Sequence, residues 1–199
     1  MASKRASDKL LSEIRACTAC EAHLPHGVNP VLNFSASSRV LLVGQAPGTK
    51  VHASGVPWDD ASGERLRAWL GVSSGQFYEP DNFAIVPMGF CYPGKGKSGD
   101  LPPRPECAEL WMDSVLSHLG GRRLTLLIGQ YAQGYFLGER AEKTLTQTVQ
   151  NWKNYAPEYF VLPHPSPRNN IWLRKNPWFE EALVPALQRA VKKALKDTR

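Results

Sequence analysis

Four cysteines in two separated pairs restrict the folds that are open to this chain. Cys17 and Cys20 form a C-x-x-C motif, Cys91 and Cys107 follow with fifteen residues between them, and no other cysteine is present. Because no secretory signal is recognisable, two such pairs favour one four-thiolate metal site over disulfides. Either zinc or an iron-sulfur cluster would satisfy these ligands. The fold is then expected to hold the first helix against the loop between Cys91 and Cys107.

Apolar segments alternate between strand and helix patterns along the rest of the chain. Continuous apolar runs predict buried parallel strands at residues 39–44, 83–86, 124–128 and 159–162. Helices are predicted near residues 7–17, 62–70, 105–119, 130–137 and 176–196, and a loop rich in Gly and Pro at 92–106. This order predicts a three-layer α/β/α fold with a four-stranded parallel sheet. We expect a single domain over residues 1–199, with the first helix and first cysteine pair in residues 1–20.

Two helices carry specific end signals. Ser7 is a suitable N-cap for the first helix, whose residues Leu10, Leu11 and Ile14 share one face. Pro185 lies inside the last helical pattern. It predicts either a kink or a later start of that helix.

The charge and the apolar pattern indicate the kind of partner. The formal net charge is +6, which suits a polyanion such as DNA because Lys and Arg neutralise phosphates. Many basic proteins bind no nucleic acid, so charge alone does not decide this. No run of eighteen apolar residues is present. We therefore expect no membrane partner and a cytoplasmic protein, where unpaired thiols survive.

Two short motifs follow predicted strands. GQAPG at residues 44–48 follows the first strand, and HPSP at residues 164–167 follows the fourth. Ligands bind beyond the carboxyl ends of the strands in sheets of this kind, so the two loops are expected to form the walls of one pocket. Each motif by itself also fits an ordinary turn.

Together, the two motifs and the cysteine spacing resemble the uracil-DNA glycosylase superfamily, specifically its iron-sulfur class, family 4. The resemblance covers roughly residues 17–170. It implies a hydrolase of base-excision repair that cleaves the N-glycosidic bond of a flipped deaminated base, uracil first. It also implies a structural 4Fe-4S cluster on Cys17, Cys20, Cys91 and Cys107, with zinc as the alternative. The expected partner is damaged DNA, single- or double-stranded, bound by a monomer.

The resemblance assigns roles around the flipped base. The backbone of residues 44–47 (Gly44, Gln45, Ala46 and Pro47) is expected to lie against the base and its sugar, where small side chains permit a close approach. Trp58, in the segment Gly55-Val56-Pro57-Trp58, resembles the family's stacking aromatic. A core position under the following helix is the alternative for Trp58.

The HPSP motif is implied to act on the leaving base and the DNA backbone. His164 would donate a hydrogen bond to the base's O2 as negative charge develops there. Ser166 would hold a phosphate, and Arg168 would fill the gap in the duplex or pair with phosphate. An ordinary hydrogen-bonded loop histidine is the alternative for His164.

The chain departs from the family pattern at two places. Family 4 has Glu where this chain has Gln45, and the GQDP enzymes have Asp where it has Ala46. Asp59 and Asp60 are the nearest substitutes for orienting water or stabilising the sugar cation, although Asp60 is equally suited to cap a helix. Pro87 occupies the position of the family's base-reading Asn. Hypoxanthine or xanthine is therefore an alternative substrate, and a catalytically weak DNA-binding protein is an alternative function.

Overall fold

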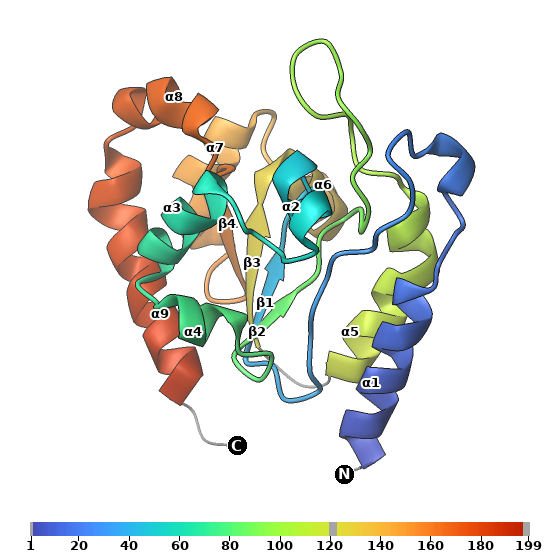
Figure 1. Cartoon of the computed structure of the whole chain (residues 1–199). Helices are drawn as coiled ribbons and strands as arrows, with labels where there is room; N and C mark the ends of the chain where they lie inside the picture. Colours follow the sequence, from blue (N-terminus) through green and yellow to red (C-terminus); the bar gives the residue numbers. More distant parts are fainter. Residues whose placement is uncertain (1, 120–122, 197–199) are drawn as a thin grey trace.

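A four-stranded parallel sheet forms the centre of the computed structural model, which describes residues 2–119 and 123–196 (Figure 1). The strands are β1 (Val40–Val43), β2 (Phe83–Ile85), β3 (Leu124–Ile128) and β4 (Tyr159–Leu162). Their order is β2-β1-β3-β4, and each neighbouring pair is parallel. All four predicted strands are confirmed.

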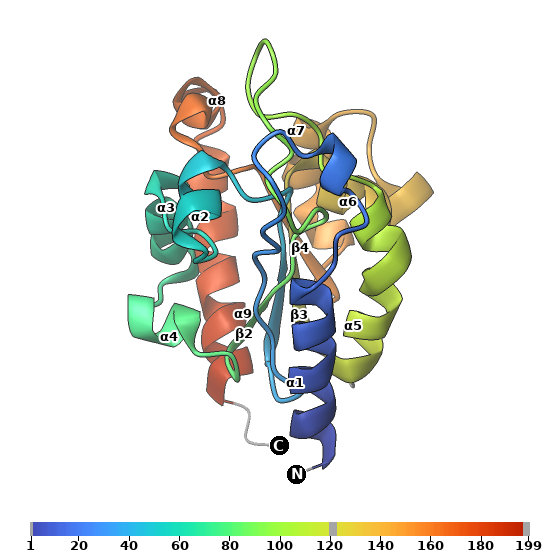
Figure 2. The same cartoon turned by 45° about the vertical axis from the view of Figure 1, so that its right-hand side comes forward.

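Two hydrophobic cores cover the two faces of the sheet, because alternate side chains of each buried strand point in opposite directions. Leu41 and Val43 of β1 enter one core with α1 (Ala2–Arg15), α5 (Asp113–Leu119) and α6 (Gly129–Leu137). Val40 and Leu42 enter the other with α3 (Ala61–Leu70), α4 (Ser74–Tyr78) and α9 (Val184–Lys196). Figure 2 shows these helices on opposite sides of the sheet. The predicted three-layer α/β/α fold is confirmed.

Helix ends were predicted less well than helix positions. Ser7 does not cap α1, because that helix begins at Ala2 and Ser7 lies inside it with a buried side chain. Ala, Lys and Arg before Ser7 favour helix and extend it by more than a turn. At the other end of the chain, a π-helical turn at Phe179–Leu183 precedes α9, whose second residue is Pro185. Trp178 and Val184, on either side of that turn, both have right-handed helical backbone. Pro185, which has no N–H to donate, therefore lies inside a continuous helical segment directly after the π-helical turn and does not mark a later start.

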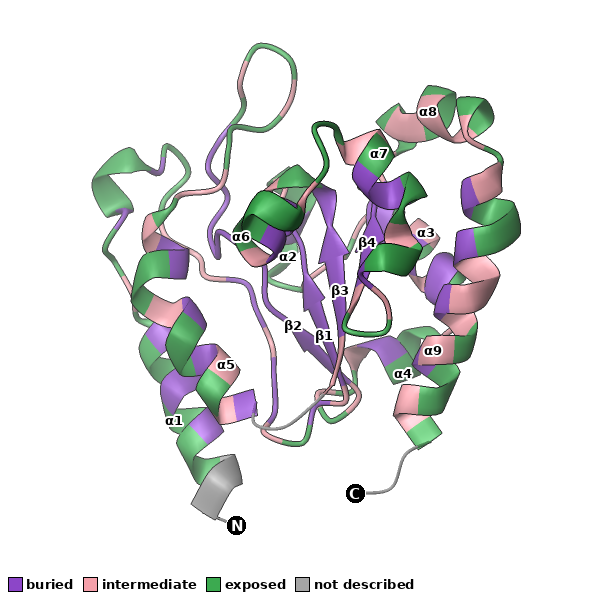
Figure 3. Cartoon of the chain, turned by 180° about the vertical axis from the view of Figure 1, so that it is seen from behind, coloured by how far each residue is buried: buried purple, intermediate pink, exposed green. Residues whose placement is uncertain are grey.

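The carboxyl ends of the strands all lie at one edge of the sheet, the upper edge in Figure 1. Three short helices that the sequence did not indicate surround this edge: α2 (Thr49–Ser54), α7 (Leu145–Gln150) and α8 (Asn170–Lys175). The strands themselves are buried, as Figure 3 shows. β3 passes directly into α6 at Gly129, which has a φ of 81°. Among the described residues, no helix is long and apolar enough to cross a membrane.

Candidate functional site

The first wall of the candidate site is the loop of residues 44–48, which leaves β1. The carbonyl oxygens of Gly44 and Gln45 accept hydrogen bonds from the N–H groups of Met88 and Gly89, both at 2.9 Å. Gly44 also packs against Trp58, since a Cβ at Gly44 would lie 2.9 Å from Cζ2 of the indole. A larger residue at position 44 would therefore displace the ring.

Trp58 is held in an unusual backbone conformation. In the described part of the chain it is the one non-glycine residue with a positive φ, 57°, which costs about 1–2 kcal/mol for an L-residue. Its carbonyl oxygen accepts from Arg67 Nη1 and from the Tyr78 hydroxyl, each at 3.4 Å. The same oxygen lies so close to α3 that a Cβ on Gly63 would be 1.8 Å away. These contacts fix the half-buried indole against the second core and beside the cavity.

His164 follows β4 and faces Trp58, with ring centroids 5.5 Å apart. Its Nδ1 accepts a hydrogen bond from the backbone N–H of Ser166 at 3.2 Å. The neutral imidazole must then carry its proton on Nε2. Burial lowers the pKa of His164 below its ordinary value of 6.5, against the opposing charges of Asp60 and Asp100. The ring is therefore a neutral Nε2–H donor at neutral pH.

One cavity of about 240 Å³ lies between these two walls. Nearly all of the site residues that the sequence suggested line it: Gly44, Gln45, Ala46, Pro47, Trp58, Asp60, His164, Ser166 and Arg168. Asp59 does not line the cavity, and its side chain is exposed. Asp60 is in extended backbone (φ −158°, ψ 179°), so its neighbour points to the other side.

Asp60 has a structural role as well as a place at the cavity. It is the N-cap of α3, and its Oδ1 accepts a hydrogen bond from the N–H of Gly63 at 2.8 Å. The capping interpretation of Asp60 is therefore confirmed. A second carboxylate, Asp100, also lines the cavity and was not indicated by the sequence.

The cap at Asp60 can be separated from its charge by two substitutions. We expect Asp60→Ala to lower the free energy of unfolding by about 1 kcal/mol, because Ala cannot accept from Gly63. Asp60→Asn should leave stability close to that of the parent, since Asn caps helices as well as Asp does. Denaturant unfolding of both variants checks this. Equal stability of Asp60→Ala and the parent would contradict the capping role.

Further contacts position the HPSP loop. Arg65, which the sequence analysis missed, donates from Nη1 to the Ser166 carbonyl at 3.2 Å and from Nη2 to Asn170 Oδ1 at 2.8 Å. It thereby ties α3 to the loop. Arg168 lies against the loop of residues 92–106, since a Cβ on Gly99 would be 2.7 Å from its Nη1. Pro87, the position of the missing family Asn, also lines the cavity.

The four cysteines gather at a separate place. Cys17, Cys20, Cys91 and Cys107 line one small cavity together with apolar side chains and Arg104, and all four thiols are free. The N–H of Phe90 donates to Cys107 Sγ at 3.4 Å. Burial raises the pKa of Cys107 to about 12, and the other three sulfurs add to this rise. Within residues 2–119 and 123–196, no group of three or more His, Cys, Asp or Glu side chains is arranged to hold a metal ion.

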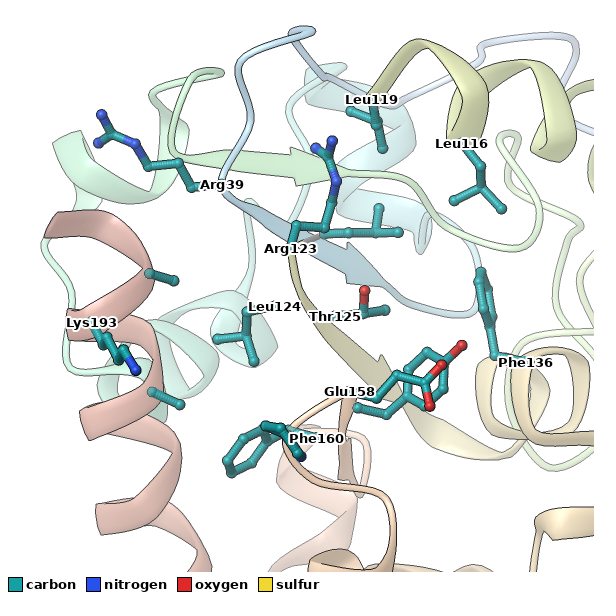
Figure 4. A pocket seen from close by; sticks show the side chains of 15 residues that line it. Arg39, Leu116, Leu119, Arg123, Leu124, Thr125, Phe136, Glu158, Phe160 and Lys193 are labelled. Atoms are coloured by element: carbon teal, nitrogen blue, oxygen red, sulfur yellow. The ribbon is translucent and has the colours of Figure 1, made fainter. Parts of the chain in front are cut away.

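A larger cavity of about 1060 Å³ lies at the opposite edge of the sheet (Figure 4). Arg39 and Glu158, which line it, directly precede β1 and β4. It is therefore at the amino ends of the strands, away from both motif loops. In sheets of this kind the ligand site is at the carboxyl ends, so we assign the candidate site to the smaller cavity.

A comparison with protein-family models agrees with this assignment. Residues 33–188 match the uracil DNA glycosylase superfamily. The matched range contains all four strands, both motif loops and the second cysteine pair, whereas Cys17 and Cys20 precede it. With the parallel three-layer fold and the cavity at the carboxyl ends of β1 and β4, this match shows that the chain belongs to the uracil DNA glycosylase superfamily.

Proposed function

We propose that the protein is a monofunctional DNA glycosylase. It would hydrolyse the N-glycosidic bond of a deaminated base that is flipped out of DNA, with uracil as the first candidate, and leave an abasic site. The observation that carries this proposal is the neutral Nε2–H donor of His164 beside Trp58, in a cavity at the expected edge of the sheet. A flipped base needs a planar surface to stack on and donors for its edges.

The chemistry proposed for His164 follows from its tautomer. As the glycosidic bond stretches, the electron pair moves into the base and negative charge grows on its carbonyl oxygen. A donor fixed in advance stabilises this charge without reorganisation. Ser166 keeps the donor proton on Nε2 of His164, because the Ser166 N–H donates to Nδ1. Arg65 in turn holds the Ser166 carbonyl.

Hypoxanthine and xanthine are the second candidate substrates. Pro87 lines the cavity where relatives place an amide that reads uracil, and proline offers no side-chain donor or acceptor. Discrimination between bases then depends on the backbone of residues 44–47. We therefore expect a broader range of bases than a site with that amide accepts.

We further propose that the four thiolates hold a 4Fe-4S cluster with a structural role. Support comes from the cavity that they share and from the N–H that Phe90 directs at Cys107. Four thiolates are the ordinary ligand set of such a cluster. When bound, the cluster would cross-link Cys17 and Cys20 to Cys91 and Cys107. It would have no redox role, because the hydrolysis transfers no electrons.

A panel of oligonucleotides tests the function. Each carries uracil, hypoxanthine or xanthine, as a single strand and as a duplex, and alkali reveals abasic sites after incubation. We expect strand cleavage only after alkali, because a monofunctional enzyme leaves the backbone intact. DNA binding without excision of any base would contradict the proposal and favour a DNA-binding protein that keeps only the fold.

Trp58 offers a matched pair of substitutions. Trp58→Ala and Trp58→Gly both remove the ring, so we expect both to slow single-turnover excision by at least tenfold. Only Gly accepts a positive φ without strain, so Trp58→Gly should be about 1 kcal/mol more stable than Trp58→Ala. Affinity for undamaged DNA should stay near the parent's, since the lost contact is to the base. Excision at the parent's rate in both variants would show that Trp58 serves only the core.

A further inference from the structure

We propose that Asp100 is the catalytic carboxylate that orients and deprotonates the attacking water. This inference rests on the proposed glycosylase function and names a residue for a role that the loop of residues 44–48 leaves without an acidic side chain. Gln45 and Ala46 stand where relatives carry Glu or Asp. Asp100 comes instead from the loop of residues 92–106.

The placement of Asp100 brings its carboxylate to the cavity, beside the last residue of the loop of residues 44–48. It lines the cavity, and a Cβ on Gly48 would lie 3.6 Å from its Oδ2. One oxygen of Asp100 therefore lies next to the loop that carries the carboxylate in relatives. The charges of Asp60 and, to a smaller extent, Asp100 also act on the imidazole of His164. Asp100 is exposed, so solvent water reaches it.

Neighbouring residues hold Asp100 in this place. The Tyr92 hydroxyl donates to Oδ1 at 3.4 Å, which leaves Oδ2 on the side of Gly48. Tyr92 is itself buried and stacked on His26, with centroids 5.1 Å apart. The backbones of Asp100 and Lys95 also form an isolated antiparallel β-bridge across the loop. The carboxylate is thus attached to a folded loop whose base is anchored in the protein.

Gln45 fits this arrangement better than a Glu would. Its Nε2 donates to the carbonyl oxygen of Leu101, the residue after Asp100, at 3.3 Å. A carboxylate at position 45 has no donor and would repel that carbonyl. Gln in place of Glu at position 45 therefore removes one acidic side chain. It also holds in place the loop of residues 92–106, which carries the acidic side chain of Asp100.

The two other candidate carboxylates are less suited to the role. Asp60 uses Oδ1 to cap α3, at the Trp58 side of the cavity. Asp59 is exposed and does not line the cavity. Neither lies within 4 Å of a Cβ built on Gly48, where Oδ2 of Asp100 is the one neighbour found.

The reaction balances with Asp100 as the base. The bond between the sugar C1′ and the base nitrogen breaks, and its electron pair leaves with the base, whose charge His164 stabilises. The water oxygen forms the new bond to C1′. One water proton passes to Oδ2 of Asp100 and then to solvent or to the departed base. The negative carboxylate also stabilises the cationic sugar before the water attacks.

Single-turnover excision by the full chain tests the assignment. Asp100→Asn is expected to slow excision by on the order of a hundredfold or more, because a positioned base contributes about 10² to 10⁴ in rate. Asp81→Asn is the matched control, since it removes the same charge from an exposed residue that precedes β2 at the far edge of the sheet. It should keep the parent's rate. Undamaged DNA should bind both variants alike.

A binding measurement gives a readout that a merely structural role would not change. DNA with a cationic pyrrolidine abasic analogue imitates the charged sugar, and DNA with a neutral tetrahydrofuran analogue is its control. The parent should prefer the cationic analogue. Asp100→Asn should lose at least about tenfold of that preference and bind the neutral analogue as the parent does.

The outcomes separate this inference from the proposed function. A parent protein that excises no base would refute the glycosylase proposal, and the role of Asp100 with it. A parent that excises, together with Asp100→Asn at the same rate or with an unchanged preference for the cationic analogue, would overturn the Asp100 assignment alone. A rate loss confined to Asp60→Asn would also overturn it and give the role to Asp60.

Discussion

Replacing His164 by Ala is expected to slow base excision by about two to three orders of magnitude, the usual loss when one preorganised donor to a developing anion is removed. The loss should appear in the single-turnover rate and not in DNA affinity, because the base carries most of its charge only in the transition state. Rapid-quench kinetics with saturating enzyme measures it. His118→Ala, a half-buried position on α5 that does not line the cavity, is the control and should excise normally.

The pH dependence of His164 gives a second measurement of the same residue. Burial lowers its pKa in the folded protein, so the unfolded chain takes up the proton first as pH falls. The stability that depends on neutral His164 is therefore complete above about pH 6.5 and is lost as pH falls below that value. Protonation would also place a proton on Nδ1, which could then no longer accept the hydrogen bond from the N–H of Ser166. We expect excision to persist at pH 6.5 and to fall only in more acidic buffer. A rate loss centred above pH 6.5 would contradict the neutral donor.

Replacing Cys107 by Ala is expected to cause the largest loss of stability. The parent, purified without oxygen, should be brown with broad absorbance near 400 nm, roughly as thiolate-bound iron-sulfur centres are. Cys107→Ala should lose the iron and the colour. It should also lower the free energy of unfolding by several kcal/mol, about 10 °C or more in Tm for a chain of this size, because metal binding contributes directly to folding.

Metal-free parent protein is the matched control for Cys107→Ala. Both should melt at nearly the same temperature, since each lacks the same cross-link and the small cavity tolerates the substitution. The candidate cavity lies apart from the cysteines, so we expect slow excision to survive in both below their melting temperatures. A colourless parent with one zinc ion per chain would exclude the iron-sulfur proposal. A Cys107→Ala variant as stable as the metal-loaded parent would exclude a structural role for any metal.

The sequence predicted the sheet because buried parallel strands are continuous apolar runs, and β1 (Val40–Val43) and β3 (Leu124–Ile128) are clear cases. The sequence predicted helix ends and short helices less well, because tertiary contacts determine them. Ser7 has the chemistry of an N-cap, yet good helix formers precede it and its side chain is buried. The short helices α2, α7 and α8 have too few residues for a periodic pattern and form where they pack.

The candidate site was predictable where a motif lies at a strand end and less so elsewhere. His164 and the loop of residues 44–48 follow β4 and β1 directly, so the topology alone brings them to one edge. Asp59 and Asp60 are neighbours after a turn, and only the backbone conformation decides which of them faces the cavity. Asp100 had no signal at all. Its position depends on how residues 92–106 fold back over the first motif, and a loop rich in Gly and Pro carries no periodicity.

The place of β3 determines how a site of this kind can acquire a new base preference. β3 lies between β1 and β4 and enters α6 at Gly129 without a loop, and no residue of β3 or α6 is among the lining of the cavity between residues 44–48 and residues 164–167. Both of these loops start after their strands have ended. Changes in either loop that keep Gly44 against Trp58 therefore shift no strand register. Libraries of loop variants can accordingly explore other damaged bases while the scaffold stays folded.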